Sequence, residues 1–368
     1  MILYINGNYP HHSLHEELVT RLADMGNAII VFVPMRGKKL DGKYHSDHHD
    51  VSVLYEDCLK GLDRVFFLQK IYRIVKRIEE QIDLKNVGCI IAGTLYSDGF
   101  AAYLLHQKYN IPFSVAVRQT DITYQMRWRP YLDGIVKRLL DHSTNIIFLS
   151  PTYKRYFDKF NTDQAKYMTI PNAVNEFWFS HRPKTRMIHT PISLIYVGEV
   201  VKNKNVGATI ASVAELKKNN VEVEFHIIGS GDEEKNCRTL SKNMNVEKQV
   251  FFHGWQNSKE KLKEFYDRAD IFVMPSYRET FGTVYVEAMS QGLPLIYTKG
   301  QGIDGYFDEG SIGYGCDPTD VHDIANKILL IIDHYKEISE QCTIQSDIFR
   351  WNIVADQYNR VINGMERK

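Results

Sequence analysis

Residues 275–296 read PSYRETFGTVYVEAMSQGLPLI, and this stretch is the starting point for the fold and the function. A short apolar run before it predicts a buried strand, and Gly282 then opens a helical pattern. A helix start offers free backbone N–H groups and a positive dipole, which suit a phosphate. Glu279 and Glu287 could accept hydrogen bonds from hydroxyl groups beside that phosphate. The alternative is an ordinary strand-turn-helix unit with surface glutamates.

Short apolar runs alternate with helical patterns on both sides of this stretch. In the C-terminal half, strands are predicted at 192–197, 223–228, 250–252, 271–274 and 295–297, with helices near 205–219, 232–244, 258–268, 283–291 and 320–333. In the N-terminal half, strands are predicted at 2–5, 28–33, 51–55, 88–92, 113–117, 145–149 and 167–170, with helices starting at 13 and lying near 62–81, 97–109, 131–141 and 151–160. This alternation predicts an α/β fold with parallel sheets covered on both faces by helices.

The chain of 368 residues is long enough for two such halves. A polar, basic segment with two prolines, SHRPKTRMIHTP, interrupts the alternation at 180–191 and is interpreted as a linker. We therefore predict an N-terminal Rossmann-like domain over 1–180, a C-terminal Rossmann-like domain over 181–346, and a final aromatic-rich helix over 347–368. Ligands of open α/β sheets bind outside the carboxyl ends of the strands, so we expect a cleft where the two sheets face each other.

The composition excludes several classes of protein. Lysine plus arginine and aspartate plus glutamate are equal at 45 each, which gives no indication of nucleic-acid binding. The five cysteines form no C-x-x-C pair, which argues against a zinc site or a disulfide framework and favours a reducing compartment. The N-terminus has no signal-peptide pattern, and no stretch reaches the ~18–20 apolar residues that a membrane span requires. We expect a cytoplasmic protein.

Several motifs occur in the order found in one enzyme family. The spacing of Glu279 and Glu287 resembles the E-x7-E motif of the retaining GT-B glycosyltransferases of family four, also called glycosyl transferases group 1. The other matching segments are IPNAVN at 170–175, YVGE at 196–199 followed by Lys204, FHIIGSG at 225–231, FHGW at 252–255 and the loop 300–305, with looser matches at 96–99 and 117–121. The resemblance implies a GT-B fold, in which two Rossmann-like domains face each other across a cleft and the last helix crosses back onto the acceptor-binding N-domain.

The resemblance also implies the roles of individual residues in the donor site. Glu279 would hydrogen-bond hydroxyls of the donor sugar, and Glu287 would bind the ribose. Lys204 would hold the diphosphate together with backbone N–H groups. Trp255 would lie beside the nucleobase, with a core tryptophan as the alternative. The remaining donor-binding candidates act through their backbone or shape the floor of the cleft: Gly198, Gly229, Gly231, Phe281, Gly282 and Thr283.

One position departs from the family pattern, because Glu199 stands where the family usually has arginine. Two cations on a diphosphate stabilise the negative charge that builds up on the leaving group, whereas a carboxylate repels it. We hypothesise that Lys202 and Lys204 act together, while Glu199 points away or pairs with a basic neighbour. Arg278 is a further candidate cation, with an exposed salt bridge as its alternative.

The acceptor side rests on weaker signals. Many family members have a catalytic histidine after the strand at 113–117, but this chain reads RQTD from Arg118 to Asp121. Arg118 and Asp121 are therefore catalytic candidates for acceptor binding or acid-base help, with a structural ion pair as the alternative. Gly7 and Asn8 in the first loop should approach the donor phosphates or the acceptor.

Three further patterns concern metals and cofactors. The chain contains no D-x-D, the usual Mg²⁺ or Mn²⁺ holder of GT-A transferases, so we predict a reaction without metal or cofactor. YHSDHHD at 44–50 could bind a metal by composition, although a solvated loop is the favoured interpretation. Neither half has G-x-G-x-x-G after its first strand, which weighs against an NAD-linked enzyme.

Taken together, the resemblance implies a retaining hexosyltransferase-type enzyme that moves a sugar from a UDP- or GDP-sugar to a glycan or lipid-linked acceptor. We expect it to act in bacterial surface polysaccharide synthesis (capsule, exopolysaccharide or lipopolysaccharide). Basic amphipathic segments at 64–77 and 126–140 predict peripheral contact with an anionic membrane at its inner face. Packing of their apolar sides on the core is the alternative. A non-catalytic sugar-nucleotide-binding paralogue and a GT-B sugar-nucleotide epimerase are the competing functions.

Overall fold

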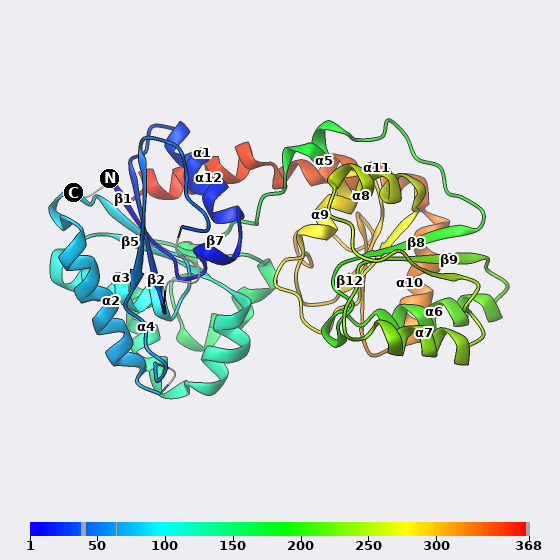
Figure 1. Cartoon of the computed structure of the whole chain (residues 1–368), viewed down its shortest axis with the longest axis horizontal. Helices are drawn as coiled ribbons and strands as arrows, with labels where there is room; N and C mark the ends of the chain where they lie inside the picture. Colours follow the sequence, from blue (N-terminus) through cyan, green and yellow to red (C-terminus); the bar gives the residue numbers. More distant parts are fainter. Residues whose placement is uncertain (38–41, 64, 366–368) are drawn as a thin grey trace. The chain divides into compact units, whose positions relative to one another are not determined.

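The structure is a computed structural model that describes residues 1–37, 42–63 and 65–365. The chain forms two compact units. The first contains Met1–Leu149, Tyr153–Asn172 and the segment that begins at Trp351, and the second contains Ser150–Thr152 and Ala173–Arg350. Each unit holds a parallel sheet with helices on its two faces (Figure 1). The predicted class, an α/β chain with two Rossmann-like sheets, is confirmed.

In the part of the first unit that the structure describes, seven parallel strands form the sheet: β1 Ile2–Ile5, β2 Ile29–Met35, β3 Val51–Asp57, β4 Cys89–Ala92, β5 Phe113–Val117, β6 Ile146–Phe148 and β7 Tyr167–Thr169. Their order is β3-β2-β1-β4-β5-β6-β7. β1, β4, β5 and β6 are buried along their whole length, which is why the sequence shows them as short continuous apolar runs. The order reverses between β1 and β4, so the loops after these two strands lie side by side.

Among its described residues, the first unit has five α-helices: α1 Leu14–Asp24, α2 Phe67–Gln81, α3 Ser97–Tyr109, α4 Asp133–His142 and α12 Trp351–Asn363. The short turns are η1 Tyr9–His11, η2 Leu84–Asn86, η4 Pro130–Leu132, η5 Pro151–Phe160 and η6 Gln164–Lys166, which are 3₁₀, and η3 Asp121–Met126, a π-helix. The helix predicted near 151–160 is present as the 3₁₀-helix η5, and the helix expected near 62–81 begins only at Phe67. The final helix α12 packs against α1, where Asn27 Nδ2 donates to Asn359 Oδ1 at 3.0 Å (Figure 1).

Six parallel strands form the sheet of the second unit: β8 Ile192–Val197, β9 Val223–Ile228, β10 Val250–Phe252, β11 Ile271–Val273, β12 Leu295–Thr298 and β13 Gly313–Cys316. Their order is β10-β9-β8-β11-β12-β13. The helices are α5 Glu176–Ser180, α6 Val206–Lys218, α7 Glu234–Asn243, α8 Lys259–Arg268, α9 Thr283–Ser290, α10 Val321–Asp333 and α11 Tyr335–Gln345, with 3₁₀ turns η7 Lys202–Lys204 and η8 Ser346–Phe349. α6, α7 and α10 cover one face of the sheet, and α8, α9 and α11 cover the other (Figure 1). The strand β13 and the helix α11 were not predicted.

Three further facts bear on function. β8 and β11 are neighbours in the sheet, with Leu194 opposite Ile271, so the loops that follow them meet at the same edge. Across the described ranges, no helix combines the length and the apolar character that crossing a bilayer would require. All five cysteines are free thiols, and all but Cys58 are buried.

Candidate active site

The loops after β8 and β11 are joined by hydrogen bonds that bring the expected donor-site residues together. Tyr277 N donates to Asn203 O at 2.8 Å, and Asn203 Nδ2 donates to Arg278 O at 2.8 Å. Asn205, buried with a left-handed φ of 56°, donates from Nδ2 to Pro275 O at 3.1 Å. The turn η7 is thereby held against the segment 275–279, although the two are far apart in the sequence.

Lys204 and Glu279 form an ion pair across this junction. Lys204 Nζ lies 2.6 Å from Glu279 Oε2, and the two side chains are only 24% and 11% exposed. The other carboxylate oxygen accepts from Thr280 N at 3.1 Å. Glu279 N in turn donates to Gln301 Oε1 at 2.9 Å. The structure therefore places side by side the residue predicted to bind the diphosphate, Lys204, and the residue predicted to bind the donor sugar, Glu279.

The helix α9 begins beside this pair. Its N-cap, Gly282, has φ 77°, a conformation that favours glycine, and a Cβ there would lie 2.5 Å from the Tyr285 ring. Because glycine has no side chain, the N-cap position supplies no capping oxygen to the first backbone N–H groups of the helix, which begins at Thr283. Phe281 is buried against Phe349, with ring centroids 5.5 Å apart, and fixes the approach to the helix.

Glu287 lies one turn into α9, on the face toward α8. Burial raises the pKa of its carboxyl from 4.5 to about 7, while Lys259 and the neighbouring Trp178 and Tyr266 side chains counteract part of that shift. The carboxyl therefore keeps its proton to a higher pH than an exposed glutamate does. A protonated carboxyl can both donate to and accept from hydroxyl groups.

Replacing Glu287 by glutamine should flatten the pH dependence of stability. The pKa of Glu287 is raised on folding, so the folded state binds its proton more tightly, and the free energy of unfolding falls as the pH rises from about 4.5 to about 7. We expect Glu287→Gln to be more stable than wild type at pH 8 by on the order of 1–2 kcal/mol, and equal to it near pH 4. Urea unfolding at both pH values measures this, and two parallel pH profiles would contradict it.

Glycines at the carboxyl ends of β8 and β9 allow a close approach of the backbone. Gly229 has φ 151°, and a Cβ there would lie 1.8 Å from Gly198 O. A Cβ on Gly231 would lie 2.4 Å from Val200 O. Gly229 also bridges to Gly254 after β10. These predicted floor positions thus lie where the backbones of three successive loops touch.

Trp255 follows this bridge on the surface of the second unit. Its side chain is 57% exposed, and its Nε1 donates to Asn257 Oδ1 at 2.7 Å. The alternative of a core tryptophan is therefore wrong for Trp255. The buried tryptophan of this unit is Trp178 on α5, which is 1% exposed.

The three charged residues around η7 differ in their surroundings. Glu199 is exposed and, within the described residues, forms no ion pair, while its backbone oxygen accepts from Tyr196 Oη at 2.8 Å. Lys202 and Arg278 are also exposed. Lys204 forms the ion pair with Glu279 described above. The joint action of Lys202 and Lys204 on a diphosphate stays a prediction.

In the first unit, Asp121 is buried and surrounded by backbone donors. Its carboxylate accepts from Arg118 N at 2.8 Å, Leu95 N at 3.1 Å and Tyr96 N at 3.4 Å, the last two at the start of α3. Burial raises its pKa to about 6. The Arg118 side chain donates from Nε to Gly93 O at 2.9 Å. These contacts favour a structural part for Asp121, and the acceptor-binding roles of both residues stay predictions.

Asp98 is a buried acid that the sequence did not single out. It is fully buried at the start of α3, where Gly7 N donates to both carboxylate oxygens at 3.4 Å and Thr94 Oγ1 donates at 3.0 Å. Burial raises its pKa to about 7. Asn8 N donates to the side chain of buried Asn6 at 2.9 Å. The loop of Gly7 and Asn8 is thus held by the buried side chains of Asp98 and Asn6. In the sequence, Asp98 was indicated only by the loose family match at 96–99.

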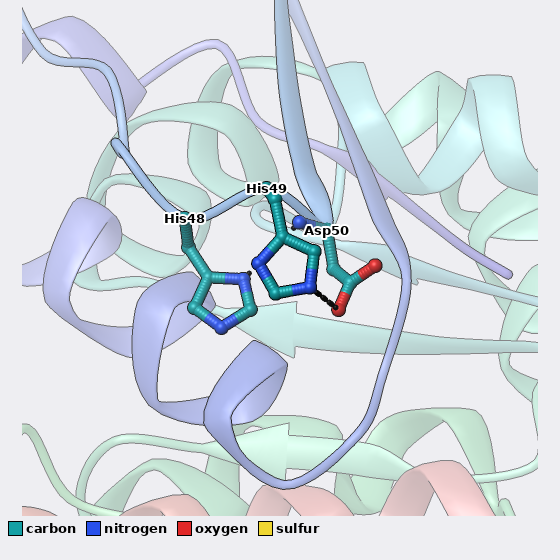
Figure 2. A group of neighbouring side chains, drawn as sticks. All are labelled: His48, His49 and Asp50. Atoms are coloured by element: carbon teal, nitrogen blue, oxygen red, sulfur yellow. Dashed lines mark hydrogen bonds and ion pairs between the residues drawn. The ribbon is translucent and has the colours of Figure 1, made fainter.

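The histidine-rich segment before β3 forms a small cluster (Figure 2). Ligand atoms of His48, His49 and Asp50 lie within 4.8 Å of one another. His49 Nε2 is 3.1 Å from an Asp50 oxygen, and His48 Nδ1 accepts from Asp50 N at 3.1 Å. His49 and Asp50 are exposed, so these contacts belong to a turn at the surface. This arrangement favours the solvated loop over a metal site.

The fold and the residues at the edge of the second sheet define a class of enzyme. Two units with parallel sheets and an E-x7-E segment at the start of α9 are typical of transferases that use nucleotide sugars. Residues 179–346 match the family Glycosyl transferases group 1, and residues 15–176 match Glycosyltransferase Family 4. The chain belongs to this glycosyltransferase family, whose members have the GT-B fold and retain the anomeric configuration.

Relatives and solved structures agree with this assignment. N-acetyl-alpha-D-glucosaminyl L-malate synthase from Bacillus anthracis is 23% identical over 78% of this chain and 77% of its own length. The lipopolysaccharide core biosynthesis glycosyltransferase LpsE from Rhizobium meliloti is 30% identical, over 37% of this chain and 38% of its own. Sucrose-phosphate synthase from Thermosynechococcus elongatus superposes with a TM-score of 0.75 at 18% identity, covering 98% of each chain. Anabaena HepE in complex with UDP gives 0.71 at 16% identity, covering 98% and 99%. At these identities the solved structures show the fold alone.

Proposed function

We propose that this glycosyltransferase moves a sugar from a UDP- or GDP-sugar to a glycan or lipid-linked acceptor, without a metal ion or a cofactor. The acceptor belongs to a bacterial surface polysaccharide, that is, capsule, exopolysaccharide or lipopolysaccharide. The observation that carries the donor side is the Lys204–Glu279 pair at the start of α9. The acceptor side is supported by the relative LpsE, which acts in lipopolysaccharide core synthesis.

In the proposed donor site, Lys204 and the first backbone N–H groups of α9 bind the diphosphate. They stabilise the negative charge that develops on it as the bond to the sugar breaks. Glu279 accepts hydrogen bonds from sugar hydroxyls, and Glu287, on the same helix, binds the ribose. Gly198, Gly229 and Gly231 let the backbone approach the ligand, and Trp255 lies beside the base. Because Lys204 supplies the positive charge, activity should persist in EDTA.

The reaction follows from retention of the anomeric configuration. The acceptor hydroxyl attacks the anomeric carbon on the face from which the diphosphate departs. The bond between that carbon and the phosphate oxygen breaks, the new glycosidic bond forms, and the hydroxyl proton passes to the departing phosphate. Arg118 and Asp121 are the proposed acceptor-side residues, of which Asp121 acts by fixing the start of α3. Gly7 and Asn8 approach the donor phosphates or the acceptor.

A thermal-shift panel of UDP-, GDP- and ADP-sugars tests the donor. A ligand that binds only the native state raises the free energy of unfolding by mass action, by about 2.7 kcal/mol at a hundredfold excess over Kd. The unfolding midpoint rises accordingly. We expect one nucleotide class to stand out. Release of nucleoside diphosphate that requires an added acceptor then identifies a transferase, whereas interconversion of the sugar without acceptor would identify an epimerase.

We further propose peripheral contact with an anionic membrane at the inner face of the cytoplasmic membrane, carried by exposed apolar side chains. The charges of α2 contribute less than the sequence implied: Lys70 donates to Ser97, Arg73 pairs with Asp63, and Arg77 pairs with Glu56 and Glu80. Arg64 lies outside the described residues. The apolar side of α2, with Ile71, Ile74 and Val75, is buried in the core.

The exposed apolar side chains gather instead at the start of α2 and in the segment before α4. Val65, Leu68 and Tyr72 are 71%, 50% and 70% exposed, and Trp128 and Tyr131 are 67% and 70% exposed. The two segments touch, because the Arg129 guanidinium lies 4.5 Å from the centre of the Phe67 ring. Aromatic and aliphatic side chains beside arginines are the composition of a membrane-interface site.

Flotation with liposomes that contain anionic lipid tests this surface. We expect wild-type protein to float at low salt, and Trp128→Ala/Tyr131→Ala to lose at least tenfold of its binding, since two large rings no longer enter the interface. The matched control is Met187→Ala/Ile344→Ala, which removes side chains that are 83% and 62% exposed in the second unit. Failure of the wild type to float at low salt would remove the membrane proposal.

A further inference from the structure

The side chains of Lys204 and Glu279 form an ion pair, and the main chain of Glu279 is held by its own surroundings. Their side-chain atoms lie 2.6 Å apart in surroundings that leave the carboxylate 11% exposed. The main chain of Glu279 is held by Gln301, which accepts from Glu279 N at 2.9 Å and donates to Tyr277 O at 2.9 Å. A Cβ on Gly302 would lie 3.2 Å from Glu279 Cγ, so the glycine leaves the Glu279 side chain space that a larger residue would take. With its main chain held by Gln301, the carboxylate changes partner by rotation of its side chain.

A diphosphate that reaches Lys204 has to compete with Glu279 for the ammonium group. A nucleoside diphosphate alone would draw the ammonium toward the phosphates and weaken its contact with a largely buried carboxylate, which keeps its hydrogen bond from Thr280 N, next to new negative charge. Glu199, exposed on the same loop as η7, adds another negative charge there. A nucleotide sugar brings hydroxyl donors that can satisfy Glu279 at the moment it releases Lys204.

We propose that this exchange of partners makes the site selective for the sugar-bearing nucleotide over the nucleoside diphosphate. The inference rests on the proposed donor site and assigns Glu279 a second effect beyond holding the sugar. While the sugar is attached, Glu279 is hydrogen-bonded and Lys204 is free for the phosphates. Once the sugar has left, Glu279 competes again for Lys204, and the product diphosphate is displaced. Glu279 is therefore a specificity-determining residue that opposes product retention.

Calorimetric titration of wild type and Glu279→Gln with UDP and UDP-glucose tests the proposal. If the thermal-shift panel selects another base, the ligands are GDP and a GDP-sugar, or ADP and an ADP-sugar. Glutamine has nearly the same shape but no charge, so it leaves Lys204 available. We expect the Kd for UDP to fall about fivefold to tenfold and the Kd for UDP-glucose to rise at least tenfold. Glu279→Asp, whose shorter side chain reaches Lys204 less well, should shift both affinities in the same directions by smaller factors.

The matched control is Glu199→Gln, which removes an equal charge from an exposed position without touching Lys204. It should change the affinities for UDP and UDP-glucose together, in the same direction. Equal changes for the two ligands in Glu279→Gln, with a native unfolding curve, would overturn the partner exchange while leaving the donor site standing. A wild-type protein that binds neither member of any nucleotide pair would overturn both proposals.

Discussion

Replacing Lys204 by alanine is expected to lower kcat for nucleotide release by about 10²–10³-fold, with a smaller change in KM. The loss should fall on kcat because the lysine acts on charge that develops as the sugar–phosphate bond breaks. Its ammonium already lies in a partly buried position, 24% exposed, where a charge acts more strongly than in water. Steady-state release of the nucleoside diphosphate, measured with acceptor present, gives both constants.

The matched control is Lys202→Ala, two residues earlier in the same turn and exposed. If the two lysines act together as hypothesised, its kcat should fall by about tenfold, clearly less than in Lys204→Ala. Because Lys204→Ala also leaves Glu279 without its cation, the double variant Lys204→Ala/Glu279→Gln separates lost stability from lost catalysis. Near-normal kcat in a folded Lys204→Ala protein would refute the assignment.

Replacing Gly229 by alanine is expected to lower the free energy of unfolding by more than about 4 kcal/mol, and so to abolish cooperative folding of the second unit. The added Cβ would lie 1.8 Å from Gly198 O at a φ of 151°. The atoms that the Cβ would meet belong to the backbone of Gly198 and not to a flexible side chain. The clash can therefore be relieved only by separating the loops after β8 and β9. Thermal unfolding followed by circular dichroism measures the effect.

Gly134→Ala is the matched control for this prediction, because it adds the same methyl group in the helix α4. Apart from its chain neighbours and the backbone of its own helix, no atom of the described residues lies within 4 Å of the position that its Cβ would take. Alanine is the better helix former, so this variant should gain about 0.5–1 kcal/mol. A Gly229→Ala protein that unfolds at the wild-type temperature would contradict the close approach of the two loops.

The sequence predicted most of the two sheets because their strands are buried on both faces. The runs that became β1, β4 and β5 contain few polar residues and end at recognisable turns. β13 escaped prediction because it reads GYGC, and glycines carry no hydrophobic pattern. α11 escaped because it buries Ser339 and Cys342 beside Tyr335 and Ile338, which blurs its apolar stripe.

In the candidate site, local motifs could be read from the sequence, but pairings between distant segments could not. The spacing of Glu279 and Glu287 is visible in one helix, whereas the contact of Lys204 with Glu279 joins residues 75 positions apart. It depends on β8 and β11 being neighbours in the sheet. The same limit applies to α2. Its sequence predicts basic side chains free to contact a membrane, whereas in the structure Arg77 pairs with Glu56 and Arg73 pairs with Asp63.

The packing of α12 against α1 has a consequence for synthesis of the chain. The first unit is assembled from both ends of the sequence, since its last helix begins at Trp351 and the second unit is made in between. At ribosomal speeds, the stretch Ala173–Arg350 takes on the order of 10–40 s to emerge. During that time the surface of α1 that later meets α12 stays open to solvent and to chaperones. The first unit is therefore the first to begin synthesis and the last to be completed. A chain released early from a stalled ribosome would leave the α12-binding surface of α1 exposed.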